Sequence, residues 1–434
     1  MAGERRYIPA SEFCASVRDG THDSPKPVER GRRLVTSRHL TTGRLDLSDA
    51  YLISEEDFDS INKRSKVSQW DVLISMIGTV GEPCLIKEEP DFAIKNIGLF
   101  KTKSEADGKW LYYFLRSKDA QQSIREQSRG TTQQYIPLGA LRDFPILVAD
   151  DPEEQKTIAQ ILGALDDKIE LNRRMNATLE AMARALFQSW FVDFDPVRAK
   201  LDGRQPTGLD ADTAALFPDH LEDSPLGHIP KDWEVCSLAN KIELLSGGTP
   251  KTSEPSYWDG DIPWYSVKDA PSETDVWVIH TEKRVTKEGI ANSAAQILPE
   301  GTTIISARGT VGKLALIGTP MAMNQSCYGV RGTKGFGDFF TYFALRQATA
   351  DLQQRTHGTV FDTITRQTFE TLDCIFPPAN LTAAFDRTVT PLLAQIHANL
   401  HQSRTLATQR DALLPKLLSG EISVVNAEQE VASV

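Results

Sequence analysis

Cysteine is scarce in this sequence, and its pattern excludes two kinds of stabilised site. The cysteines are scattered and odd in number, and no C-x-x-C pair occurs. This pattern argues against a disulfide framework and against a zinc site. It favours a reducing compartment, so we expect a cytoplasmic protein. The five residues are Cys14, Cys84, Cys236, Cys327 and Cys374.

Long apolar runs are also absent. No run approaches the roughly 20 residues that a membrane-spanning helix needs, and the first ten residues, MAGERRYIPA, lack the apolar segment of a secretion signal. We therefore expect no membrane association. A chain of 434 residues is long enough for two to four domains with cores of their own.

The short motifs of common enzyme classes are missing. The sequence has no G-x-x-x-x-G-K-[ST], G-x-G-x-x-G, H-E-x-x-H or G-x-S-x-G pattern, and no Asn/Asp-Pro-Pro-Tyr/Phe stretch of the adenine-methyltransferase kind. His397 and His401 lie four residues apart on a predicted helix without a third ligand, so we expect a solvated face there. We expect the acid pairs Glu153-Glu154 and Asp166-Asp167 to face solvent as well. The sequence therefore predicts no catalytic, cofactor-binding or metal-binding residue.

Positive charge is not in excess, because the formal net charge is −11. The acidity is local: residues 150–230 hold 8 Lys+Arg against 16 Asp+Glu, whereas residues 1–149 hold 22 against 21. A near-neutral domain can bind DNA through local basic patches, but the long-range attraction is weak. We expect modest DNA affinity unless a partner helps.

An internal repeat is the most informative feature that is present. The stretch LISMIGTVGEPCLIK (73–87) returns as IISARGTVGKLALIG (304–318), 231 residues later. Gly130-Thr131 returns as Gly358-Thr359, and a long helix-like segment follows each copy. A repeat of this length indicates a duplicated domain-plus-helix unit. Two similar modules on one chain can read two separate sites on one partner.

Two long helices are predicted by capping and by apolar periodicity. Asp150 to Glu154 gives an acidic cap with Pro152 in the first turn. Each helix then carries a three-four stripe that predicts an antiparallel coiled coil. Asn172 and Asn399 are either buried in that seam or exposed at its edge, and the tail from Glu421 is expected to fray. The stripes are Leu162, Leu165, Ile169, Asn172, Asn176, Leu179, Ala183 and Leu186, and Val389, Leu392, Ile396, Asn399, Ser403, Leu406, Leu413 and Leu417.

These patterns predict an α+β fold in which two duplicated globular domains are separated by two long helices that form an antiparallel coiled coil. The predicted segments are a first domain at 1–149, a central helix at 150–191, a connector at 192–229, a second domain at 230–377, a distal helix at 378–420 and a tail at 421–434.

Glycine-polar loops in each copy are the candidate binding sites. For the repeated GTVG itself we favour a hairpin turn in which Thr caps backbone groups. For the Arg/Gln and Asn/Gln loops we favour DNA contact, because Gln can read adenine and Arg can read guanine. The candidate DNA-binding residues are Thr21, His22, Thr79, Lys95, Asn96, Arg129, Thr131, Gln133, Thr249, Lys251, Arg308, Thr310, Asn324, Gln325, His357 and Thr359.

Longer segments resemble a known family. The stretch DPEEQKTIAQILGALDDKIELNRRMNATLEAMARALFQSWFVDFDPVRAK, the ending LATQRDALLPKLLSGEI, and the domain openings DGTHDSP (19–25) and LSGGTPKT (245–252) resemble specificity (S) subunits of Type I restriction–modification systems. The likeness covers nearly the whole chain. One departure is that the first domain lacks the Gly-x-Ile-Pro-x-x-Trp lead found at 227–233.

The resemblance implies a non-catalytic DNA-recognition subunit. Each globular domain would be a target recognition domain that reads one half of a split double-stranded DNA site, and the helices would set the spacing and dock two modification (methyltransferase) subunits. S-adenosylmethionine, ATP and Mg would belong to the modification and restriction subunits, with no cofactor in this chain. One alternative is a non-catalytic coiled-coil scaffold without DNA specificity. Another is a fused restriction–methylation enzyme, against which the missing motifs argue.

Overall fold

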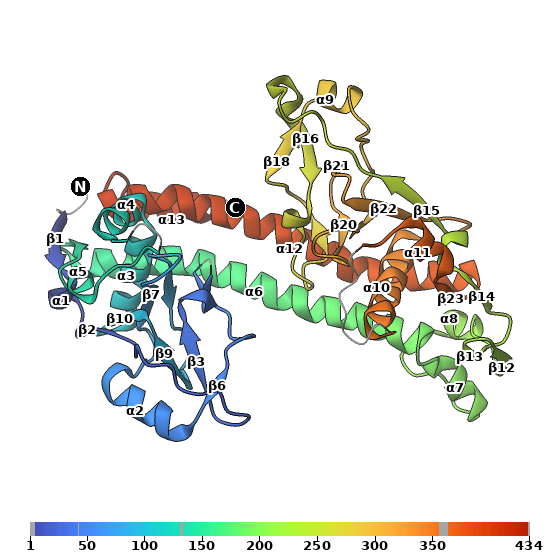
Figure 1. Cartoon of the computed structure of the whole chain (residues 1–434), viewed down its shortest axis with the longest axis horizontal. Coiled ribbons are helices and arrows are strands. Elements are labelled where there is room, and N and C mark those ends of the chain that lie inside the picture. The colour runs from blue at the N-terminus through green and yellow to red at the C-terminus, as the bar shows by residue number, and fades with distance from the viewer. Residues whose placement is uncertain (1–4, 42, 131–132, 356–362, 433–434) are drawn as a thin grey trace. The chain divides into compact units, whose positions relative to one another are not determined.

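The computed structural model describes residues 5–41, 43–130, 133–355 and 363–432, and its contacts divide the chain into two compact units. Unit 1 comprises residues 1–169 and 405–434, and unit 2 comprises residues 170–404. Two long helices, α6 (Pro152–Phe191) and α12 (Ala379–Ser419), contribute a stretch to each unit (Figure 1). The prediction of two long helices beside two α+β parts is confirmed.

Unit 1 is built on a four-stranded antiparallel sheet beside a three-stranded one. Its central strand β7 is buried along its whole length, which explains its uninterrupted apolar sequence. The four strands, in spatial order, are β2 (Ser16–Asp19), β10 (Ile97–Lys101), β7 (Val72–Ser75) and β8 (Pro83–Leu85). The three-stranded sheet consists of β6 (Leu52–Ile53), β3 (Arg32–Thr36) and β9 (Phe92–Lys95), with β3 and β9 parallel. Two strand pairs complete the unit, β1 (Arg5–Pro9) with β11 (Pro145–Ala149), and β4 (Leu40–Thr41) with β5 (Arg44–Leu45).

Helix α3 (Glu105–Arg116) packs its apolar face into the core of unit 1. The Ser104 hydroxyl accepts a hydrogen bond from the Asp107 amide, which fixes the start of the helix. Trp110 is fully buried, and its Nε1 donates to the Leu147 carbonyl at 2.7 Å, so α3 is tied to β11. The other helices are α1 (Ala10–Phe13), α2 (Glu55–Ser65), α4 (Lys118–Gln127), α5 (Leu138–Arg142) and α13 (Val424–Ala432).

Unit 2 repeats this arrangement, which confirms the predicted duplication. Its larger sheet, in spatial order, consists of β15 (Ile242–Ser246), β22 (Cys327–Gly332), β19 (Thr303–Ser306), β20 (Leu314–Ile317) and β17 (Trp277–Val278). A three-stranded sheet contains β18 (Lys283–Val285), β16 (Trp258–Tyr265) and β21 (Ala322–Met323), and β16 and β21 are parallel as β3 and β9 are. The strand pairs are β14 (Glu234–Ser237) with β23 (Asp373–Phe376), and β12 (Leu221–Ser224) with β13 (Gly227–Pro230).

The segment 192–229 carries its own secondary structure and joins the core of unit 2. Phe194, Val197 and Phe217 from this segment are buried in that core. Its Pro, Gly and Asp residues separate short elements whose apolar residues pack inward. The helices of unit 2 outside α6 and α12 are α7 (Asp195–Leu201), α8 (Ala211–Ala215), α9 (Lys287–Ala291), α10 (Asp338–Arg355) and α11 (Arg366–Thr371).

Within each unit, α6 and α12 run antiparallel, as predicted. In unit 1, Leu162 and Leu165 share a core with Leu413 and Leu417. In unit 2, Asn172 contacts Gln402, whereas Asn176, one turn later, contacts Asn399, so rising numbers on α6 meet falling numbers on α12. The three asparagines Asn172, Asn176 and Asn399 are 0%, 2% and 4% exposed. The seam interpretation of Asn172 and Asn399 is therefore confirmed over the exposed one.

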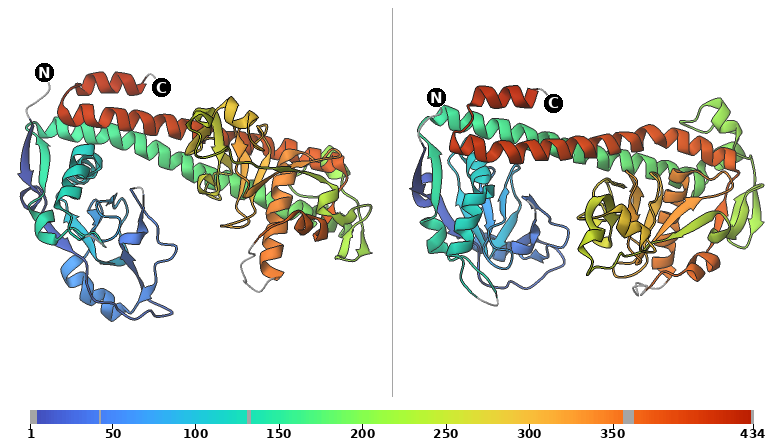
Figure 2. Two further views of the ribbon diagram at one scale, coloured as in Figure 1. Left: turned by 45° about the horizontal axis from the view of Figure 1, so that its top comes forward. Right: turned by 90° about the horizontal axis from the view of Figure 1, so that it is seen from above.

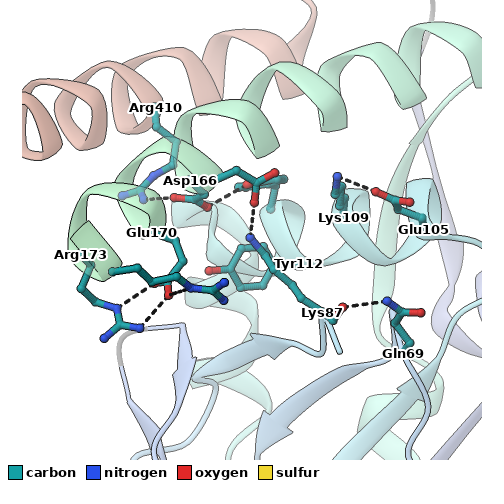
Figure 3. A network of polar contacts seen from close by, with 12 residues as sticks. Gln69, Lys87, Glu105, Lys109, Tyr112, Asp166, Glu170, Arg173 and Arg410 are labelled. Carbon is teal, nitrogen blue, oxygen red and sulfur yellow. Dashed lines mark hydrogen bonds and ion pairs between the residues drawn. The ribbon is translucent and has the colours of Figure 1, made fainter. Parts of the chain in front are cut away.

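A polar cluster attaches α3 to the helix pair in unit 1 (Figure 3). The Tyr113 hydroxyl donates to Asp166 Oδ2 at 2.8 Å, and Arg410 of α12 makes an ion pair with Asp166 Oδ1. Burial and Asp166 together raise the pKa of Tyr113. Burial lowers the pKa of Arg410, but its interactions with Asp166 and Asp411 together outweigh burial and raise that pKa.

The prediction that the acid pairs of α6 face solvent holds for Glu153 and Asp167, which are exposed, and is wrong for Glu154 and Asp166, whose side chains are each 15% exposed. Asp166 holds the cluster just described, and Asp167 accepts a hydrogen bond from Lys87 Nζ at 2.6 Å. Glu154 accepts from Arg5 at 2.9 Å with both side chains at most 15% exposed. These carboxylates compensate cations that the folded chain brings within reach, and linear sequence does not reveal such partners.

The expectation that the tail frays is also wrong, because residues 424–432 form α13 alongside the end of α12 (Figure 2). Ala427 is fully buried, and Ile422 and Val424 pack against the core of unit 1. Gly420, with a φ of 75°, directly follows the last residue of α12, where a left-handed glycine commonly ends a helix. None of the helices within the described ranges is long and apolar enough to cross a membrane.

Candidate nucleic-acid interface

In unit 1, strand register brings the candidate loops to one edge of the four-stranded sheet. This edge is where β2 and β7 end and β10 begins. Asp19, at the end of β2, pairs with Gly98, and Ser75, at the end of β7, pairs with Ile97 at the start of β10. The loops that follow β2 and β7 and the residues that precede β10 therefore meet at the same edge. The pairing of these strands cannot be read from the local sequence of any one of them.

Four of the predicted residues form one cluster at this edge. Thr21 and Lys95 pair as neighbouring backbone segments, and the Asn96 amide donates to the Thr21 carbonyl at 3.1 Å. His22 Nδ1 lies 2.8 Å from Asn96 Oδ1, and Lys95 Nζ donates to Ser24. The structure thus brings Thr21, His22, Lys95 and Asn96 together.

Thr79, residues 129–130 and residues 133–136 form the neighbouring part of the edge. The Gly78 amide donates to the Gln134 carbonyl at 3.2 Å, and Arg129 and Tyr135 exchange two backbone hydrogen bonds of 2.8 Å. The side chains of Thr79, Arg129 and Gln133 are exposed. Thr131 lies outside the described residues.

Unit 2 presents the equivalent edge. Ser246 at the end of β15 pairs with Tyr328, and Ser306 at the end of β19 pairs with Cys327 at the start of β22. The Gly248 amide donates to the Met323 carbonyl at 2.9 Å, which places the loop that carries Thr249 and Lys251 beside Asn324 and Gln325. Thr249 and Gln325 are hydrogen-bonded to each other.

The second GTVG copy lies at this edge as well. Arg308 and Thr310 are exposed on it, and the Ile364 amide donates to the Ala307 carbonyl at 2.9 Å. Ile136 bonds the Met76 carbonyl in the same way in unit 1. The candidates His357 and Thr359 lie outside the described residues.

Serine, and not the predicted threonine, braces each GTVG turn. Ser75 Oγ accepts from the Glu82 amide at 2.8 Å, and Ser306 Oγ accepts from the Lys313 amide at 2.8 Å. Each serine hydroxyl also donates to the carbonyl of the threonine, Thr79 or Thr310. The hairpin-turn interpretation holds, and the side chains of both threonines are exposed.

Two residues that sequence reasoning missed support these loops. Arg64 from α2 donates to the Gly20 carbonyl at 2.8 Å and lies 3.3 Å from Asp19 Oδ1. Arg366 of α11 donates to Ser246 Oγ at 3.2 Å. Asp19, the partner of Arg64, was not predicted either, although it lies in the quoted DGTHDSP opening, which could have indicated it. Arg64 and Arg366 give no such signal, because neither lies in a quoted motif.

Among the described residues, no three His, Cys, Asp or Glu side chains gather in a way that could hold a metal ion. His397 is half-buried, with Nε2 2.9 Å from the Gly318 carbonyl oxygen and its ring against Trp277. The prediction of a solvated face is thus wrong for His397, whereas His401 is exposed. The exposed loops can offer hydrogen bonds and positive charge, which suits binding.

Comparison with known proteins connects this architecture to one family. The family described as Type I restriction modification DNA specificity domain matches residues 39–181 and 230–383. The chain is 27% identical to the specificity subunit of the Type I restriction enzyme HindI of Haemophilus influenzae, over 72% of this chain and 77% of that protein. It is also 27% identical to the MjaIX specificity subunit of Methanocaldococcus jannaschii, over 73% and 69%.

A solved structure agrees in fold. The Type I restriction–modification S subunit from M. genitalium superposes with a TM-score of 0.55 at 16% identity and covers 96% of both chains. The family match spans both copies of the repeat and part of each long helix. This chain therefore belongs to the Type I restriction–modification DNA specificity family and is a specificity subunit, the non-catalytic component that recognises DNA.

Proposed function

We propose that each of the two sheet edges reads one half of a split double-stranded DNA site. The observation that carries this proposal is the duplication of the edge itself. In both units a loop after the first strand of the larger sheet, a GTVG turn and the residues before β10 or β22 meet at one edge. Two similar readers in one chain suit a site with two separate halves.

The recognition domains in this proposal are residues 1–149 and 230–377, joined by a helix at 150–191, a connector at 192–229 and a distal helix at 378–420, with a tail at 421–434. The long helices α6 and α12 set the spacing between the half-sites and dock two modification subunits. A continuous helix suits a spacer because each residue adds a fixed rise of about 1.5 Å.

The catalytic partners are modification subunits that methylate adenine and restriction subunits that translocate and cleave DNA. In this proposal, S-adenosylmethionine, ATP and Mg bind to those subunits. The cytoplasm is the proposed location, because DNA and these cosubstrates are found there. The near-neutral first domain, with 22 Lys+Arg against 21 Asp+Glu, suits a reader whose partners supply part of the DNA clamp.

The experiment that tests the proposal is a genome-wide map of adenine methylation. Cells expressing this chain with its modification subunit are compared with cells that have the modification subunit alone. We expect a split motif with two short halves and a fixed gap that disappears when this chain is omitted. Methylation that is unchanged without this chain, from a modification subunit shown to be active, would favour the scaffold without DNA specificity.

A further inference from the structure

Each recognition domain holds one carboxamide side chain at its reading edge by the oxygen atom. In unit 1 this residue is Asn96, whose Oδ1 lies 2.8 Å from His22 Nδ1. The other ring nitrogen, His22 Nε2, lies 3.0 Å from Asp19 Oδ2. An amide oxygen only accepts hydrogen bonds, so the contact with Asn96 Oδ1 is a hydrogen bond in which His22 Nδ1 donates. Asp19 and Asn96 thus hold the His22 ring between them.

The backbone of Asn96 is fixed as firmly as its side chain. Its φ of 53° lies in the left-handed region, which is uncommon for residues other than glycine. Its amide donates to the Thr21 carbonyl at 3.1 Å, and its carbonyl accepts from the Ser37 hydroxyl at 3.0 Å. An unfavourable backbone conformation that its surroundings hold in place is a common feature of binding sites.

Unit 2 holds Gln325 in a corresponding way. The Thr249 hydroxyl, from the loop that opens the second domain, donates to Gln325 Oε1. Gln325 is exposed and lies three residues before Tyr328, which pairs with Ser246 at the edge of the sheet. In both domains a side chain of the opening loop, His22 or Thr249, thus engages the oxygen of an amide that precedes the next sheet strand.

The engaged oxygen leaves the NH2 group as the part of each amide that is available. Within the described ranges, neither Asn96 Nδ2 nor Gln325 Nε2 donates to a protein acceptor, and neither is a buried unsatisfied atom. Asn324 differs, because its Oδ1 accepts from the Ser326 amide at 3.0 Å and closes a local turn. The two edges therefore each present one oriented, solvent-accessible donor.

We propose that Asn96 and Gln325 are specificity-determining residues that donate from their NH2 groups to a base acceptor in the major groove. Purine N7, guanine O6 and thymine O4 are the acceptors exposed there. His22 and Thr249 are positioning residues that prevent each amide from turning its oxygen toward the base. This assignment rests on the proposed function and adds to it which atom of each domain reads a base.

The test is the methylation map repeated with Asn96→Asp and, separately, with Gln325→Glu. Each change replaces the NH2 group by an oxygen and keeps the original oxygen. We expect Asn96→Asp to reduce methylation at wild-type sites by about tenfold or more, through one base pair of the first half-site only. Gln325→Glu should do the same in the second half-site only.

Gln205→Glu, at an exposed residue of the segment 192–229 and outside both sheet edges, is the control for the added charge. Both half-sites should stay as in the wild type. His22→Ala tests the positioning role: the freed amide can offer either atom, so discrimination at one base pair relaxes while total methylation persists.

The outcomes separate this assignment from the proposed function. A wild-type split motif that Asn96→Asp and Gln325→Glu leave unchanged overturns the donor assignment and leaves the proposed function standing. Absence of any split motif with the wild-type chain overturns the proposed function and this assignment with it. If Asn96→Asp abolishes all methylation, His22→Ala decides: relaxed discrimination at one base pair supports the assignment, and unchanged discrimination overturns it.

Discussion

Asn399 on α12 donates from Nδ2 to Asn176 Oδ1 on α6 at 2.9 Å, in the buried interior of unit 2. Asn176 Nδ2 in turn donates to Asp275 Oδ1 at 3.2 Å, in the loop before β17. A polar pair in an apolar seam costs stability but fixes the register of two helices. Here the same pair also ties the helices to the second recognition domain.

Asn399→Ala should destabilise unit 2 by about 1–3 kcal/mol, because it leaves the Asn176 oxygen buried without its donor. Asn176→Ala should cost a similar amount. The double variant should cost less than the sum of the two, because the second change removes the group that the first left unpaired. Urea unfolding of the four proteins measures this coupling. Strictly additive costs would show that the bond contributes nothing specific.

Asp166→Asn should destabilise unit 1 by about 1–3 kcal/mol, because Arg410, only 11% exposed, would keep its ion pair with Asp411 but lose the one with Asp166. Asp167→Asn is the matched control on the next residue. It removes an ion pair with Lys87 whose side chains are 41% and 56% exposed, and should cost at most about 1 kcal/mol. Thermal unfolding compares them, and equal costs would contradict the structural role assigned to Asp166.

Gly247→Ala should weaken recognition of the second half-site by about tenfold, with the first half-site unaffected. A Cβ on Gly247 would clash with the backbone of Asn324, so the loop that carries Gln325 must move. Gly139→Ala is the control, because a Cβ there meets nothing within 4 Å. Binding to duplexes mutated in one half-site at a time, with the modification subunits present, measures the effect. A loss spread equally over both half-sites would contradict it.

Asp386→Asn should stabilise unit 2 at pH 7 by about 3 kcal/mol, because one pKa unit corresponds to about 1.4 kcal/mol. Burial raises the pKa of Asp386 from 3.8 to about 6. Between these values the folded chain binds a proton that the unfolded chain has released, so stability falls as the pH rises through this range. An asparagine keeps an oxygen for the Phe340 amide, which donates to Asp386 at 2.8 Å, and removes the titration. The test measures the free energy of unfolding from pH 4 to pH 8, with Glu370→Gln at an exposed residue as the control. If Asp386→Asn leaves the slope of this free energy against pH unchanged, the prediction is wrong.

Replacing residues 1–149 with the first recognition domain of another specificity subunit should change one half of the methylated motif and leave the other half and the gap unchanged. The reason is that the two edges are built from separate sheets in separate units. Methylation mapping of the hybrid gives the answer. A change in both halves would mean that the two readers are not independent.

The sequence alone determined the parts of this protein that depend on local periodicity and on repetition. The three-four stripe predicted both long helices, and their ends at Pro152 and Ser419 follow from the capping of Asp151 and from Gly420. The GTVG echo predicted the duplication, because similar segments fold alike. The family resemblance came from the long quoted segments of both helices and from the two domain openings. None of them contains a catalytic motif.

The tertiary structure decided which residues meet, because strand register and helix pairing join residues far apart in the chain. Lys87 is the last residue of the first repeat copy (73–87), yet it binds Asp167, 80 residues away. Asn96 was one of many polar candidates until the pairing of β10 with β2 and β7 placed it beside His22. These contacts join residues far apart in the chain, and no local sequence pattern encodes them. They also determine which atom of the Asn96 and Gln325 amides remains available.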